Sequence, residues 1–119
     1  MKPSKRDNIL YLEDIVTAME RIQEYIHGLD FSSFKRDYKT VDAVIRNFEV
    51  IGEASKNISK KIKDSYPNVP WEEMYRLRNR ISHEYFGVDY RIIWDIISRN
   101  LPGNLTEVKY ILEKERLKE

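Results

Sequence analysis

Apolar side chains recur every third or fourth residue along most of this chain, and this spacing constrains the fold more than any other feature of the sequence. Such a period places the apolar side chains on one stripe of an α-helix, whereas a half-buried β-strand would show strict alternation. The sequence contains no segment with the alternation of a strand. Only 4 of the 119 residues are glycine and 4 are proline, so the helices have few interruptions. The sequence therefore predicts an all-α protein.

The pattern divides the chain into several helices separated by short connections. A first helix is predicted from Arg6 to His27, with Ser4 as its cap and Gly28 as its stop. Capping residues mark the predicted starts because their side chains accept backbone N–H groups that have no partner within the helix. The further predicted segments are a short helix at 30–37, a long helix at 40–59 capped by Thr40, a third at 71–83, and a fourth after a cap at Asp89.

Some details of these helices go beyond periodicity. Gly52 lies inside the second long helix, where glycine costs about 1 kcal/mol relative to alanine, and this favours a close approach by another helix. Residues 60–65 are predicted as a frayed basic turn. The helix after Asp89 is apolar over more than half its circumference and is predicted to lie centrally in the core. Residues 101–104 are expected to break or bend that helix, and the last segment is expected to fade into the charged tail 113–119.

Short connections between long helices favour antiparallel neighbours, so we expect an up-and-down bundle of four to five helices, with residues 1–119 forming a single domain. The 21 basic and 20 acidic residues leave a net charge of +1, so any binding to nucleic acid must depend on a local patch. The start of the chain is charged and no run of 18 apolar residues is present, which predicts a soluble cytoplasmic protein without membrane contact. The absence of cysteine excludes disulfides, thiol catalysis and zinc sites built on cysteine.

One metal-binding arrangement of helical bundles needs a Glu, two residues and a His on each of two helices. This spacing occurs once in the chain, at Glu24 and His27. The other histidine, His83, is preceded at the matching position by Arg80, whose charge would repel a metal ion. We therefore expect no metal site, and we interpret Glu24 as a solvated side chain.

The segment 76–86 is the richest in candidate functional side chains. Within it, Asn79 and His83 lie four residues apart on the predicted helix, so the amide can orient the imidazole. Arg78 lies about 140° around the helix axis from His83, so the two side chains would flank a groove and would not converge on one point. Two copies of this helix across a two-fold axis would line one cleft with paired arginines and histidines. The simpler alternative is that Arg78 pairs with an acidic neighbour and His83 caps the end of its helix.

The spacing of Arg78, four residues, His83, one residue and Tyr85 resembles the signature of the HEPN superfamily. It is similar in particular to the HepT-like ribonuclease toxins, whose partner is a MntA-type minimal nucleotidyltransferase. Asn79 matches the polar residue that commonly follows the signature arginine. The resemblance covers nearly the whole chain. Further blocks that agree in order and spacing are 42–44, 48–54, 70–71, 85–89, Trp94 and 101–102.

The resemblance implies an all-α homodimer with a composite cleft at the signature and a metal-independent endoribonuclease activity that needs no cofactor. By similarity, Arg78 would hold and neutralise the scissile phosphate, while His83 would act as general acid or base. Asn79 would position His83 or the RNA backbone. Attack by the ribose 2′-hydroxyl would leave a 2′,3′-cyclic phosphate and a 5′-hydroxyl. Basic residues that can extend the RNA path are Arg76, Arg80, Lys35, Arg36 and Arg91, although the simpler interpretation of each is a solvated charge.

Tyr85 has a separate implied role, because in the resembling toxins the signature tyrosine accepts adenylate groups from the nucleotidyltransferase partner, which is the antitoxin. Each adenylate would add negative charge beside the cleft and compete with RNA for Arg78. The simpler interpretation of Tyr85 is an ordinary surface aromatic. An alternative for the whole chain is a catalytically silent helical dimer that docks onto a nucleotidyltransferase or binds nucleotide.

Overall fold

The computed structural model describes residues 3–83 and 89–118, with the backbone alone for 78–83. Within these residues all regular secondary structure is helical and no β-strand occurs, which confirms the all-α prediction for this part of the chain. None of the helices is long and apolar enough to cross a membrane in the portion described. The elements are α1 (Lys5–Ile26), α2 (Phe31–Arg36), α3 (Tyr38–Asn57), α4 (Lys60–Ser65), α5 (Trp71–His83), α6 (Tyr90–Asp95), a π-helix η2 (Ile96–Asn100) and α7 (Leu101–Leu117).

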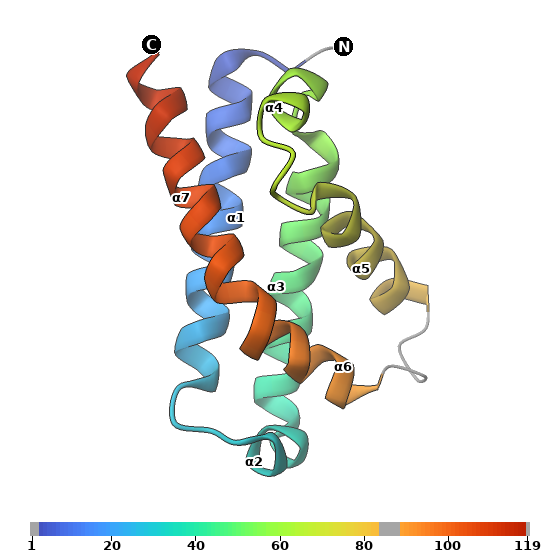
Figure 1. Ribbon diagram of the computed structural model, residues 1–119. Coiled ribbons are helices and arrows are strands. Elements are labelled where there is room, and N and C mark those ends of the chain that lie inside the picture. Colours follow the sequence, from blue (N-terminus) through green and yellow to red (C-terminus); the bar gives the residue numbers. More distant parts are fainter. Residues whose placement is uncertain (1–2, 84–88, 119) are drawn as a thin grey trace.

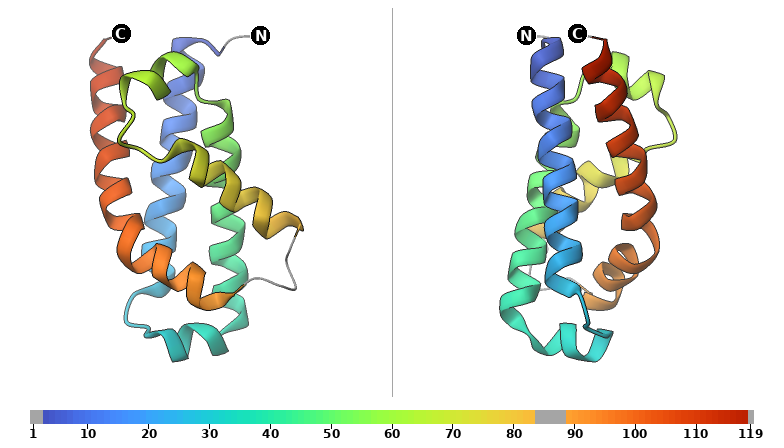
Figure 2. Two further views of the ribbon diagram at one scale, coloured as in Figure 1. Left: turned by 45° about the vertical axis from the view of Figure 1, so that its right-hand side comes forward. Right: turned by 90° about the vertical axis from the view of Figure 1, so that its left-hand side faces the viewer.

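The three longest helices determine the shape of the molecule. α1, α3 and α7 lie along its long axis, and α3 and α7 both run antiparallel to α1 (Figure 1). The short helix α2 closes one end, while α4 and both chain termini lie at the other (Figures 1 and 2). α5 crosses α3 obliquely, and its last turns point away from the long axis (Figure 2). The arrangement thus leaves the end of α5 at the side of the molecule.

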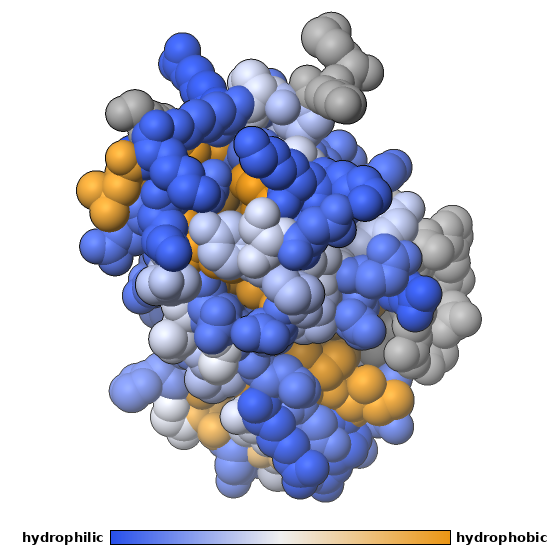
Figure 3. Space-filling view, turned by 45° about the horizontal axis from the view of Figure 1, so that its top comes forward, coloured by the Kyte–Doolittle hydropathy of each residue, from blue (hydrophilic) through white to orange (hydrophobic). Residues whose placement is uncertain are grey.

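The predicted apolar stripes form one hydrophobic core. On α1 the side chains of Leu12, Ile15 and Ile22 are fully buried, and Val44 of α3 and Ile111 of α7 are buried to the same extent. Hydrophilic side chains cover most of the surface at the end that carries the termini, and apolar surface is visible in smaller areas (Figure 3). This separation of apolar and polar residues is what a helical period of 3.6 produces when each stripe faces the other helices.

The first predicted cap is confirmed and the second is wrong. Ser4 caps α1 in a reciprocal capping box with Asp7, in which each side chain accepts a hydrogen bond of 3.0 Å from the backbone N–H of the other. α3, however, is capped by Asp37, whose carboxylate accepts hydrogen bonds from the backbone N–H (3.2 Å) and hydroxyl (2.8 Å) of Thr40. Thr40 is therefore the third residue of α3, and its hydrogen bonds hold the pKa of Asp37 below its ordinary value. At the predicted stop, Gly28 adopts a left-handed backbone conformation with φ of 79°, which costs glycine little.

Two predictions about helix ends also need correction. Residues 60–65 form a separate helix, α4, whose cap Ser59 is bound to Asn8 of α1 by two hydrogen bonds of 3.0 and 3.1 Å. Residues 101–104 do not break the chain's helical course, because Pro102 occupies the first turn of α7, where its missing N–H has no cost. The alternative of a bend agrees with the structure, since the helical course turns where η2 joins α7 (Figures 1 and 2). The preceding segment adopts the wider π-helix, in which the N–H of Leu101 bonds to the carbonyl of Ile96.

The C-terminal third of the chain differs from the prediction in burial as well. α6 is not central in the core, since Ile93 is its only buried residue and Ile92 is 40% exposed. In contrast, α7 does not fade at residue 113 but continues to Leu117, and Glu115 is buried. Its carboxylate accepts hydrogen bonds of 3.0 Å from the Tyr66 hydroxyl and from Lys118. These contacts order the last turns of α7.

Two leucines on opposite faces of α1 test the core assignment. Leu12 is fully buried, whereas Leu10 is 48% exposed. We expect Leu12→Ala to lower the free energy of unfolding by about 2–5 kcal/mol, because it removes buried methyl groups and leaves a cavity. Leu10→Ala makes the same chemical change in the same helix and should cost no more than about 0.5 kcal/mol. Urea unfolding followed by circular dichroism measures both, and equal losses would contradict this placement of the core.

Candidate active site

The helix that carries most of the predicted site residues is anchored through its first half. Trp71, the first residue of α5, is buried, and its indole N–H donates a hydrogen bond of 3.1 Å to the carbonyl of Tyr66. Met74, one turn later, is also buried, while Leu77 is half-buried. Glu72 and Glu73 lie in the first turn, where the helix dipole favours negative charge. α5 is therefore fixed at its start and presents its later turns at the side of the molecule.

The backbone of α5 brings the signature positions into one continuous helix. α5 extends through His83, so Arg78, Asn79 and His83 occupy its last two turns. In helical register His83 follows Asn79 by four residues and Arg76 by seven, and these three positions lie in one row along the helix. Arg78 is offset from that row by about 140° at 100° per residue. The helical geometry assumed in the sequence analysis is thus present in the backbone, while the side chains of 78–83 lie outside the described residues.

Of the two predicted RNA-contacting residues on α5, Arg76 is the one whose side chain is described. It is exposed, and its guanidinium lies 3.6 Å from the Glu72 carboxylate one turn earlier. An exposed ion pair of this kind contributes little to stability and breaks readily in favour of a stronger anion. Arg80, the other predicted RNA contact, follows one turn later in the described backbone. Tyr85 lies outside the described residues, so its predicted role as adenylate acceptor stays a prediction.

A cleft of about 470 Å³ lies between α5 and the junction of η2 with α7. Its floor is apolar and includes Phe48, Ile51 and Leu77, whereas polar side chains stand at its edge. Sequence reasoning missed two of these polar residues, Asn100 and Asn104, because it treated that segment as a simple helix break. The only available signal was the Asn-Leu-Pro sequence at 100–102, which marks a helix start as readily as a break. The polar edge of the cleft consists of Glu73, Arg76, Asn100 and Asn104.

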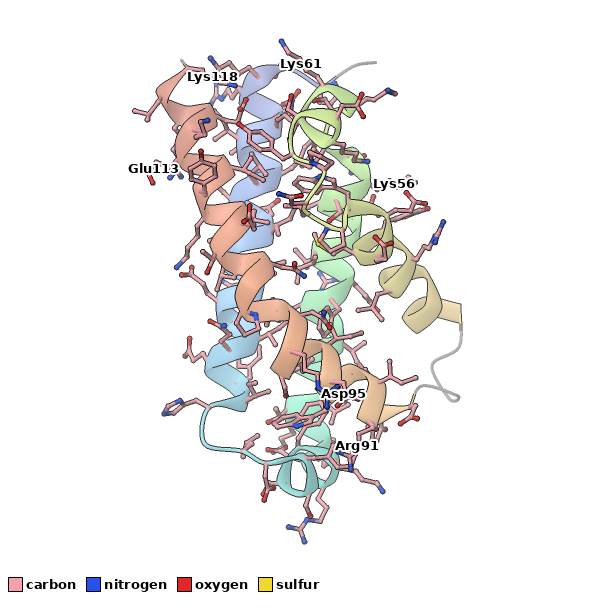
Figure 4. The ribbon with its side chains drawn as sticks, in the orientation of Figure 1. Lys56, Lys61, Arg91, Asp95, Glu113 and Lys118 are labelled. Carbon is pink, nitrogen blue, oxygen red and sulfur yellow. The ribbon has the colours of Figure 1, made fainter. Side chains whose placement is uncertain are left out.

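The charged groups around α5 include a lysine from the neighbouring long helix. Lys56 of α3 lies 5.7 Å from the centre of the Tyr75 ring, and Figure 4 shows it beside α5. A cation above an aromatic ring is attracted by the ring's negative face. Arg76 and Lys56 are thus two described cations on the side of the molecule formed by α5, which also carries Glu72 and Glu73. Such a surface suits a phosphate-bearing ligand.

Among the described residues, Glu24 and His27 join no group of metal-binding side chains. Both side chains are exposed at the end of α1. Across the described residues, no three His, Asp or Glu side chains are grouped in a way that could hold a metal ion.

Comparison with known proteins identifies the class. Residues 15–111 match the family model described as "Ribonuclease HepT-like". The chain belongs to this family, as its resemblance to the HEPN superfamily implied. It is 47% identical over 103 residues to the "Probable ribonuclease HepT" of Thermococcus cleftensis, covering 87% of this chain and 91% of that protein. It is 42% identical to a "Putative RNase" of Methanocaldococcus jannaschii (92% and 90% covered) and to another of Caldanaerobacter subterraneus subsp. tengcongensis (89% and 95% covered). No solved structure matches the chain.

The two tryptophans of the chain test how α5 is anchored. Trp71→Phe removes the hydrogen bond to the Tyr66 carbonyl while keeping an aromatic ring, and we expect it to lower the free energy of unfolding by about 1–2 kcal/mol. Trp94→Phe is the matched control, because in the described part of the structure the Trp94 indole packs against Phe34 without donating a hydrogen bond. Urea unfolding of both variants makes the comparison. If Trp94→Phe were equally destabilising, the Trp71 hydrogen bond would not be what holds α5.

Proposed function

We propose that this protein is an endoribonuclease that cuts RNA by attack of a ribose 2′-hydroxyl, without a metal ion, as the toxin of a toxin–antitoxin pair. The proposal rests on one observation: Arg78, Asn79 and His83 stand on the last two turns of a helix anchored at its other end, in a chain that belongs to the HepT-like ribonucleases. The names of its relatives as ribonucleases support the same substrate class.

The proposed reaction needs one fixed positive charge and two proton transfers. The 2′-oxygen attacks phosphorus and loses its proton to a base, the bond from phosphorus to the 5′-oxygen breaks, and that oxygen gains a proton. The products are a 2′,3′-cyclic phosphate and a 5′-hydroxyl. Arg78 neutralises the charge that develops on the phosphate oxygens, because a guanidinium donates two parallel hydrogen bonds and stays charged. His83 transfers a proton, since imidazole titrates near neutral pH, and Asn79 positions it.

We propose further that the active form is a homodimer with the signature helices facing each other across the two-fold axis. The angular offset of Arg78 from His83 means that one α5 helix presents them in different directions, and a second copy supplies the missing wall of the groove. Partly exposed apolar side chains near the end of α5 support this arrangement. Ile92 of α6 is 40% exposed, and Leu77 and Ile96 are half-buried at the cleft. Burial of such surface stabilises subunit contacts.

The two histidines of the chain allow a direct test of the reaction. The purified protein should cleave single-stranded RNA in the presence of EDTA, leave 2′,3′-cyclic phosphate ends, and leave the 2′-deoxy analogue intact. We expect His83→Ala to reduce the cleavage rate at least about 100-fold, because general acid–base catalysis contributes that much or more. His27→Ala, at an exposed position remote from α5, should cleave like the wild-type protein. Full activity in His83→Ala, or complete loss with a chelator, would refute the proposal.

The same experiments address the alternative of a catalytically silent module. In that case the wild-type protein would leave diverse single-stranded RNAs uncut, yet it would bind a nucleotidyltransferase, and His83→Ala would bind equally well. Sedimentation of the wild-type protein separately measures whether it is a dimer. A monomer that cleaves RNA at full rate would refute the composite groove and leave the ribonuclease activity standing.

We propose that a MntA-type nucleotidyltransferase antitoxin neutralises the protein by transferring adenylate groups to the Tyr85 hydroxyl. The added phosphates would lie two residues from His83 in the sequence, and their negative charge would compete with RNA for the cationic groove. Because the modification adds both charge and bulk, it acts as an off-switch without altering the core.

Mass spectrometry of protein co-expressed with such a nucleotidyltransferase tests this switch. We expect adenylate on the wild-type protein and none on Tyr85→Phe, which should still fold and cleave RNA because only the acceptor oxygen is lost. Tyr90→Phe is the matched control, since Tyr90 is a nearby tyrosine that is 37% exposed, and it should remain modified at Tyr85. Adenylate on Tyr85→Phe, or none on the wild-type protein, would contradict the assignment.

A further inference from the structure

An exposed arginine at the start of α6 is held against the outer ring of an aromatic cluster. The guanidinium carbon of Arg91 lies 4.0 Å from the centre of the Phe31 ring in α2. Phe31 in turn lies 6.5 Å from Trp94, and Trp94 lies 5.1 Å from the fully buried Phe34. The cluster therefore extends from the core to the surface and ends in a positive charge. This packing restricts the motion of a side chain that would otherwise lose considerable entropy on binding a ligand.

The Arg91 guanidinium has no carboxylate partner in the described structure. Asp95 lies one helical turn later, at a spacing that often gives an ion pair, but the two side chains form none. Figure 4 labels both and shows Arg91 beside α2. A guanidinium that stacks on an aromatic face keeps its N–H groups free at its edge, because they point in the plane of the group. The Arg91 guanidinium is therefore held in place by Phe31, and among the described residues its N–H groups have no carboxylate acceptor.

Three of the carboxylates at this end of the molecule are engaged in helix capping. Asp30, Asp37 and Asp89 are helix caps, so their carboxylates accept hydrogen bonds from backbone N–H groups. The positive ends of those helices offset part of the caps' negative charge. Lys35 stands one turn after Phe31 on the same side of α2, and it is exposed without an ion pair among the described residues.

Two exposed aromatic side chains lie close to these cations in the sequence. Tyr38, at the start of α3, is 70% exposed, and Tyr90, adjacent to Arg91 in sequence, is 37% exposed. Interleaved cations and exposed aromatic rings are the combination that binds single-stranded nucleic acid, since the cations contact phosphates and the rings stack on bases. An acidic protein segment would use the cations but not the rings, so this surface favours RNA.

The position of Arg91 relates this surface to the signature helix. α5 ends at His83 and α6 begins at Tyr90, and both views show these ends on the same side of the molecule (Figures 1 and 2). Six steps of the chain separate His83 from Asp89, which limits their Cα distance to about 22 Å. A single strand of RNA of a few nucleotides can span such a distance.

We propose that Arg91, stacked on Phe31, is a binding subsite for a phosphate of single-stranded RNA several nucleotides from the cleaved bond. This inference rests on the proposed ribonuclease function and adds to it a substrate-binding residue outside the signature. Arg91 holds the strand and does not take part in bond cleavage. Its loss should therefore weaken substrate binding and leave the rate at saturating RNA unchanged. This pattern is expected of an interaction that is equally strong in the enzyme–substrate complex and in the transition state.

Binding of a fluorescent 2′-O-methyl oligonucleotide, which cannot be cleaved by 2′-hydroxyl attack, tests the subsite by anisotropy over a range of salt concentrations. Arg91→Gln should weaken binding roughly five- to tenfold at low salt and reduce the slope of log K against log salt by about 0.7, the value for one phosphate contact on a single strand. Arg91→Lys should keep the slope while weakening binding, because it retains the charge and loses the stacked fork. Phe31→Leu should behave like Arg91→Lys.

Arg6→Gln is the matched control, because Arg6 is exposed at the start of α1, at the opposite end of the molecule from α2 (Figure 1). It should bind like the wild-type protein. Equal effects of Arg6→Gln and Arg91→Gln, or none from Arg91→Gln, would overturn the subsite, as would a protein that binds no oligonucleotide. Arg91-dependent binding of an acidic peptide with no dependence for RNA would overturn it in favour of a protein partner.

Cleavage assays keep the subsite separate from the proposed function. In a cleaving protein, Arg91→Gln should raise KM in proportion to its loss of affinity, with kcat unchanged, and an unchanged KM would overturn the subsite alone. If the wild-type protein cleaved no RNA while Arg91 still governed oligonucleotide binding, the ribonuclease function would fail and the subsite would stand.

Discussion

Burial of the apolar stripe of α1 against α3 and α7 is the interaction on which the rest of this structure depends. The stripe side chains Leu12, Ile15 and Ile22 have no exposed surface, and each buried side chain of this size contributes roughly 1.5–3 kcal/mol through removal of apolar area from water. α3 is held on one side by this contact and supports α5 on the other. The orientation of α5, and with it the placement of the signature, is therefore a consequence of core packing far from any functional side chain.

α5 combines an anchored start with a last stretch of backbone that lies at the side of the molecule (Figure 2). The hydrogen bond of Trp71 and the burial of Met74 hold its first turns, while Glu72 and Arg76 on the other side remain in solvent. Because its first turns are anchored, the position of the backbone in its last turns is fixed without any contribution of those last turns to the stability of the fold.

The sequence predicted the helices well and their ends less well, for physical reasons that particular residues illustrate. Periodicity located the buried faces of α1 and α3 because a stripe of apolar residues on a long helix has only one favourable orientation. The cap of α3 was misplaced because Asp37 and Thr40 are both good capping residues, and the choice between them depends on the angle of entry from α2. Pro102 suggested a break, yet the π-helix before it lets the chain remain helical. The burial of Glu115 depends on Tyr66, 49 residues away, and no local pattern contains that contact.

At the candidate site, the sequence identified the signature and its register on a helix, but it left the surrounding charges undecided. Arg76 and Arg91 were equivalent as solvated cations until the structure placed one beside Glu72 and the other on Phe31.

A net charge of +1 is compatible with binding a polyanion because the charges of this protein are not evenly distributed. Many carboxylates are engaged locally, either as helix caps, as in Asp37, or in ion pairs such as that of Glu20 with Lys109 at 3.0 Å. A charge matched in this way contributes little to the potential beyond the screening length of about 8 Å at physiological salt. The field felt by an approaching RNA is therefore set by the cations left without partners, and Arg91 is one that the fold also holds in place. In this way the proposed ribonuclease would gain a local attraction for RNA without a strongly basic surface that would bind every nucleic acid in the cell.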